Sequence, residues 1–149
     1  MTDEEKLAIL KQVENIAALA GLRGGIEQER GHFAMGFDMG EGRSQRVFVR
    51  PSGVSPDGKE VVTILSPARS LTKGMFAGLS RQEAIDLLKL NENMYFARFG
   101  IWETEREILI VASIDAILES LDAGEFESLA RAVTFAADGY EAKFGGDSF

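Results

Sequence analysis

The chain has 149 residues, of which 45% are hydrophobic, and it carries a formal net charge of -8 at pH 7. A chain of this length buries roughly 70% of the surface that its unfolded form exposes, which is enough for one domain spanning residues 1–149. It contains no cysteine, which excludes disulfides, thiolate metal sites and cysteine nucleophiles and is typical of a reducing cytoplasm.

All of the net charge lies in the C-terminal third. From Trp102 to Phe149 there are eleven acidic and three basic residues, whereas the first 101 residues carry thirteen of each sign. Such a field repels phosphate backbones and argues against nucleic acid as a partner, although it equally fits a solvated helix face. No apolar run approaches the ~20 residues of a membrane span, and the acidic N-terminus is unlike a signal peptide. We therefore expect a cytoplasmic protein without a membrane partner.

The first predicted element is a helix from about Asp3 to Ala20. Apolar residues recur along it at the spacing of one helical face, and acidic residues in its first turn complement the helix dipole. Glycines at 21, 24 and 25 are expected to end it.

Three strand-like segments follow. In residues 32–39, HFAMGFDM, alternation places the large apolar side chains on one face. The turn GEGR at 40–43 predicts a hairpin with SQRVFVRP at 44–51, which Pro51 is expected to end. SPDG at 55–58 is a second turn. The third strand, KEVVTILSPA at 59–68, is apolar enough to lie in the middle of a sheet.

Residues 69–79, RSLTKGMFAGL, are predicted to form a loop with exposed Met75 and Phe76. Ser80 and Glu83 form a capping box for a second helix, which is expected to end at Asn91 or Asn93.

A second hairpin is predicted from MYFARFGIWE at 94–103 and REILIVAS at 106–113. Asp122 and Glu125 repeat the capping pattern for a long final helix, and GGDSF at 145–149 reads as a frayed tail. The resulting order, α-β-β-β-α-β-β-α, predicts an α+β fold with a twisted antiparallel sheet flanked by helices, because the links between strands are too short for parallel crossovers.

The sequence contains no recognisable catalytic or metal-binding constellation. His32 is the only histidine, and no nucleophile or second ligand accompanies it at a useful spacing. No calcium-loop, zinc or phosphate-loop pattern is present. We expect neither enzymatic activity nor a cofactor or metal.

The predicted strand at 94–102 has apolar residues on both sides, although a two-layer domain should leave one side polar. Either helices cover both sides, or one side forms a homodimer interface with the preceding helix, because soluble monomers rarely expose such a face. The predicted dimer interface consists of Ile85, Leu88, Tyr95, Phe99 and Trp102.

A second surface is predicted on the first two strands, where apolar residues lie beside arginines. Met35, Arg46, Phe48 and Arg50 could receive an extended peptide. Alternatively, the first helix covers the apolar side chains as core. Core packing is favoured for Phe33 and Phe37, and both readings stay open for Met35 and Phe48.

Together with the order of elements, a diffuse set of residues resembles one superfamily. The set comprises Leu88 and Asn91 before the hairpin strand, Phe99 within it, and Asp138 and Tyr140 in the last helix. The pattern resembles the type III secretion chaperone-like fold, in its YbjN-like and Tir-chaperone branches.

The resemblance implies a small acidic cytoplasmic homodimer without enzymatic activity. The chaperone branch binds an extended segment of an exported protein and dimerises through the second helix and the following strand, which correspond here to Leu88, Tyr95, Phe99 and Trp102. The sequence thus predicts a chaperone-like protein-binding module with an exported or regulatory partner. The YbjN-like branch gives the alternative, a regulator or small-ligand sensor.

Overall fold

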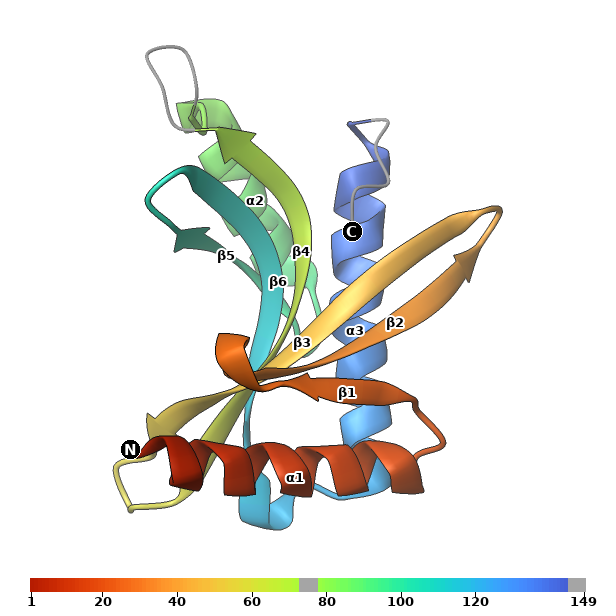
Figure 1. Ribbon diagram of the computed structural model, residues 1–149. Coiled ribbons are helices and arrows are strands. Elements are labelled where there is room, and N and C mark those ends of the chain that lie inside the picture. The colour runs from red at the N-terminus through yellow and green to blue at the C-terminus, as the bar shows by residue number, and fades with distance from the viewer. Residues whose placement is uncertain (73–77, 145–149) are drawn as a thin grey trace.

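Across the residues that the computed structural model describes, 1–72 and 78–144, the chain forms three α-helices and six strands (Figure 1). The helices are α1 (Asp3–Leu19), α2 (Arg81–Asn93) and α3 (Ala123–Ala142). The strands are β1 (Gly24–Glu27), β2 (His32–Gly40), β3 (Arg43–Val54), β4 (Glu60–Thr72), β5 (Arg98–Glu103) and β6 (Glu107–Ile117). Short 3-10 helices, η1 (Gln28–Arg30) and η2 (Leu118–Ser120), follow β1 and β6. The predicted tail at 145–149 lies outside the described residues.

The six described strands form one antiparallel sheet in the order β1-β2-β3-β4-β6-β5. The predicted α+β class with an antiparallel sheet is therefore confirmed, and the order of elements matches except for one additional strand. The hairpin turns fall where the sequence predicts them, between β2 and β3, β3 and β4, and β5 and β6. Strands β1 and β5 form the two edges of the sheet.

The additional strand is β1, whose glycines were expected only to end the first helix. Gly24 pairs with Met35 so closely that a Cβ atom on residue 24 would lie 2.4 Å from the carbonyl oxygen of Ala34 and 2.5 Å from Cζ of Phe33. Glycine is needed at this position for the close approach of two strands. Because glycine has a low strand propensity, the sequence pattern does not predict β1.

Helices α2 and α3 begin at the predicted caps. The hydroxyl of Ser80 accepts a hydrogen bond from the Glu83 amide at 3.1 Å, and the Asp122 carboxylate accepts one from the Glu125 amide at 2.7 Å. In α1 the cap is Thr2, which forms a complete capping box with Glu5. Each cap satisfies an amide that would otherwise lack a partner in the first turn, and so fixes where the helix starts.

Two strands run further than predicted. Pro51 does not end β3, because a register shift between Pro51 and Gly53 lets the strand continue to Val54. A second shift, between Pro67 and Arg69, carries β4 to Thr72. Residues 69–72 of the predicted loop are therefore strand. The predicted exposure of Met75 and Phe76 lies outside the described residues.

The helices pack against one face of the sheet, which is called the covered face below. In Figure 1, α2 and α3 lie behind the strands and α1 crosses the lower end of the sheet. The core combines Ile9, Leu10 and Val13 of α1, Phe33, Val47, Val49, Ile64 and Ile110 of the sheet, and Phe126 and Val133 of α3. Ala34, Leu65 and Val111 are also buried but do not belong to that core. They point to the opposite face, which is called the open face.

Candidate functional site

Four exposed apolar side chains lie on α2, the 94–97 connection and β5. Leu88 is 70% exposed on α2 and Tyr95 is 87% exposed in the connection. Phe96, which follows Tyr95, and Ile101 of the edge strand β5 are exposed as well. Because α2 packs on β5, these residues belong to one compact unit at the edge of the sheet. Leu88, Tyr95, Phe96 and Ile101 are called the seam surface.

The 94–97 connection is not a strand, which corrects the sequence prediction. The amide of Ala97 donates to the carbonyl of Tyr95 at 2.7 Å, and the residue between them, Phe96, has φ 64°. This is a γ-turn with a positive central φ, a strained conformation for a bulky residue. Arg98 stabilises the connection by donating to the carbonyl of Met94 at 2.8 Å. The turn exposes the rings of Tyr95 and Phe96 to solvent. Backbone strain of this kind is more common at functional sites than elsewhere.

The outer edge of β5 is partly closed by a side chain. The Asn91 amide donates to the Phe99 carbonyl at 3.1 Å and accepts from the Phe99 amide at 2.7 Å. It therefore occupies the position that a further strand would take at this residue. Closing an edge in this way protects it from unspecific strand pairing. A partner at the seam surface would consequently be held by side-chain packing more than by strand addition.

The predicted dimer-interface residues do not all lie together. Leu88 and Tyr95 lie on the seam surface, and Ile85 is half-buried on α2. Phe99 points to the covered face, where its ring centroid lies 5.2 Å from that of Tyr140. Trp102 points to the open face, because residues three apart in a strand face opposite sides. Phe96 and Ile101, which are not among the predicted interface residues, are exposed instead.

The predicted partner-binding residues are likewise divided between the two faces. Met35 is 5% exposed and packs in the core under the helices. Of the two alternatives for Met35, core packing therefore matches its position. Phe48 is half-buried on the open face, beside Arg46 and Arg50. The alternation of β3 places these three side chains on one surface, as the sequence predicts.

An ionic cluster borders Phe48 on the open face. The guanidinium of Arg46 lies 3.3 Å from the Glu27 carboxylate and 5.0 Å from the Phe48 ring centroid. Glu27 also interacts with Nε2 of His32 at 3.1 Å, and the His32 ring lies 4.7 Å from that of Phe48. The hydrogen bond from His32 lowers the pKa of the Glu27 carboxyl below its ordinary value. Arg46 and His32 are thus held by an ionised carboxylate on the same surface.

Sequence reasoning missed the buried centre of the open face. Leu65 is 2% exposed and Val111 is 6% exposed, yet neither is part of the core under the helices. Arg50 covers this centre, because its guanidinium carbon lies 4.3 Å from the centroid of the Trp102 ring. Alternation along β4 and β6 predicts which face Leu65 and Val111 occupy. No sequence pattern predicts the contact between Arg50 of β3 and Trp102 of β5.

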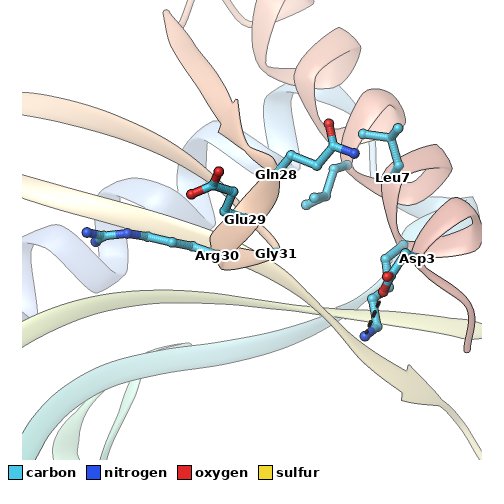
Figure 2. Close-up of a pocket in the computed structure, with 8 residues that line it drawn as sticks. Asp3, Leu7, Gln28, Glu29, Arg30 and Gly31 are labelled. Carbon is cyan, nitrogen blue, oxygen red and sulfur yellow. Dashed lines mark ion pairs between the residues drawn. The ribbon is translucent and has the colours of Figure 1, made fainter.

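A hollow of about 740 Å³ lies between α1 and η1 (Figure 2). Figure 2 shows Gln28 extended toward Leu7 of α1, while Glu29 and Arg30 extend away from the helix. At the other end of the hollow, Lys6 forms an exposed ion pair with Asp3 at 3.7 Å. The lining is mostly polar and solvent-accessible, which provides few apolar contacts for a ligand.

Within residues 1–72 and 78–144, no three histidine or carboxylate side chains gather as they would around a metal ion. In the same part of the chain, no helix combines the length and the apolar character needed to cross a membrane. No protein-family model matches this chain, and no curated protein matches its sequence.

Proposed function

We propose that this chain is a non-catalytic protein-binding module, which acts as a homodimer and holds an extended segment of a partner polypeptide. The observation that carries this proposal is the seam surface, four exposed apolar side chains on α2, the strained 94–97 turn and β5. Large apolar side chains exposed on one helix–strand unit are typical of an interface.

The second copy is expected at the seam surface. A twofold dimer uses the same surface on both subunits, so Tyr95 and Phe96 of one protomer would pack on those of its partner. Aromatic rings that contact a partner supply much of the affinity of such interfaces. Burial against the partner would also offset the cost of the positive φ at Phe96.

The partner segment is expected on the open face of the sheet. Phe48 offers an apolar contact, and Arg46 and Arg50 flank it. Extended segments often bind beside or across such strands, with apolar pockets taking alternate side chains. The proposal includes the chaperone-like fold, a cytoplasmic location, and an exported or regulatory protein as the partner.

A regulator or small-ligand sensor is the second candidate, favoured by the hollow between α1 and η1. Its volume, about 740 Å³, lies in the range of small-molecule sites. A sensor of this kind would show a higher midpoint of thermal unfolding with one metabolite, because a ligand that binds only the folded state stabilises it. A protein-binding module would not respond to a metabolite panel.

Affinity capture of the tagged protein from its native cytoplasm, followed by limited proteolysis and mass spectrometry, tests the first candidate. We expect one stoichiometric partner protein, with one segment protected from proteolysis by the bait. Phe48→Asp in the bait should abolish this protection without altering its oligomeric state, since Phe48 lies away from the seam surface. Recovery of the bait alone would contradict the proposal.

A further inference from the structure

Two long side chains meet above the centre of the open face. Arg50 belongs to β3 and Trp102 to β5, and two strands, β4 and β6, lie between them in the sheet. Neighbouring strands are about 4.8 Å apart, so contact at 4.3 Å between the guanidinium carbon and the ring centroid requires both side chains to reach over β4 and β6. Arg50 and Trp102 are called the clasp.

The clasp explains why the open face has a buried centre. Leu65 of β4 and Val111 of β6 lie between the two clasp residues, and both are almost fully buried without contributing to the core under the helices. A hollow of about 140 Å³ remains beside them, between Arg50 and Trp102. This volume fits one or two side chains and excludes a whole cofactor.

Unlike Arg46 and Arg69, Arg50 has no recorded carboxylate partner among the described residues. Arg46 pairs with Glu27 at 3.3 Å and Arg69 with Glu83 at 2.8 Å. Within the described part of the chain, the only recorded interaction of the Arg50 side chain is with the Trp102 ring. A guanidinium stacked on an aromatic ring keeps its N–H edge available for a planar carboxylate.

The remaining polar groups of the hollow favour a single negative charge. The Thr63 hydroxyl donates to the Asp115 carboxylate at 2.5 Å and is therefore already used. Ser113 also lines the hollow, and its hydroxyl makes no recorded hydrogen bond within the described ranges, so it can act as a second donor. Asp115 lies nearby and would repel a doubly charged phosphate more than a carboxylate.

We propose that the clasp binds the carboxylate side chain of an acidic residue in an extended partner segment, and this proposal rests on the proposed function. The carboxylate would lie against the N–H edge of Arg50 and the Ser113 hydroxyl. Side chains two positions apart in an extended segment face the same side. An apolar residue two positions from the acidic one would therefore pack on Phe48 or on Trp102. The segment recognised is one with the pattern apolar-x-acidic.

Selection of a displayed library of random twelve-residue peptides on the full chain tests this proposal. We expect the enriched peptides to share the apolar-x-acidic pattern. Trp102 is the only tryptophan of the chain, so its fluorescence should change when these peptides bind. Arg50→Gln in the protein, or Glu→Gln in the peptide, should weaken binding about tenfold to a hundredfold, as expected for loss of a charge-assisted pair.

Arg131→Gln is the matched control, because Arg131 lies on α3, on the covered side of the sheet, and is already paired with Glu127 at 2.8 Å. It removes the same charge away from the open face and should change the affinity no more than about twofold. Peptides without an acidic residue, unchanged affinity for Arg50→Gln, or silent Trp102 fluorescence would each overturn the carboxylate site and leave the proposed function standing. A library that yields no enriched peptide would contradict both.

Discussion

A side chain at position 24 would collide with the neighbouring strand, because its Cβ atom would lie 2.4 Å from the carbonyl oxygen of Ala34. We expect Gly24→Ala to lower the free energy of unfolding by about 1–3 kcal/mol, the usual cost of overpacking. Gly25→Ala is the control, since nothing lies within 4 Å of a Cβ atom there. Urea unfolding measures both variants. Equal stability of the two would contradict the close packing of β1 on β2.

Tyr140 makes stability depend on alkaline pH. Burial raises the pKa of its hydroxyl above the ordinary value of 10.0. Above that value the unfolded chain releases the phenolic proton while the folded chain still holds it, so the folded state binds more protons and stability falls as the pH rises. We expect Tyr140→Phe to flatten this loss above about pH 10, the unperturbed tyrosine value. Thermal unfolding followed across that range measures it, and identical slopes would contradict the assignment.

At the scale of elements, one side chain links α2 to the edge strand β5. Asn91→Ala would leave the amide and carbonyl of Phe99 without their partners. We expect the free energy of unfolding to fall by about 1–3 kcal/mol, the cost of unpaired half-buried polar groups. The control is Asn93→Ala, because Asn93 makes one exposed bond, to the carbonyl of Lys89, and should change stability by less than about 0.5 kcal/mol. A small effect at both positions in denaturant titrations would show that Asn91 is dispensable.

The seam surface predicts which helix governs self-association. Leu88→Asp introduces a charge on an exposed residue of α2, so the fold should persist while the dimer dissociation constant rises at least about tenfold. Leu19→Asp is matched to it, since Leu19 is also a highly exposed leucine, at the end of α1, which packs on β1, β2 and β3 away from β5. Sedimentation velocity should detect weakening only for Leu88→Asp. Weakening by Leu19→Asp instead would move the interface to α1.

The sequence predicts elements well where one residue type determines local geometry. The caps at Ser80 and Asp122 fix the starts of α2 and α3, and turn residues fix the hairpins. It fails where a conformation depends on packing. Alternating apolar residues at 94–97 resemble a strand, but nothing in the residue type of Phe96 indicates its positive φ. The extension of β3 beyond Pro51 likewise depends on a register shift that only the pairing with β4 reveals.

At the scale of the whole molecule, the sequence identifies the surface residues but not which of them meet. Alternation correctly places Phe48 beside Arg46 and Arg50. The contact of Arg50 with Trp102 depends on how strongly the sheet curves, because these residues come from strands that are not neighbours. Four of the five residues of the resemblance pattern also acquire physical roles. Asn91 bonds to Phe99, Phe99 packs on Tyr140, and Asp138 pairs with Arg43 at 2.9 Å, so the last helix contacts both the edge strand β5 and the inner strand β3.

The central claim is that two copies of this chain meet through the seam surface. Sedimentation equilibrium of the unmodified protein, from low to high micromolar concentration, tests it most directly. The account predicts a species with twice the mass of one chain, which Leu88→Asp converts to single chains of unchanged thermal stability. A single-chain mass at every concentration would contradict the homodimer and leave the exposed rings of Tyr95 and Phe96 without the role assigned to them.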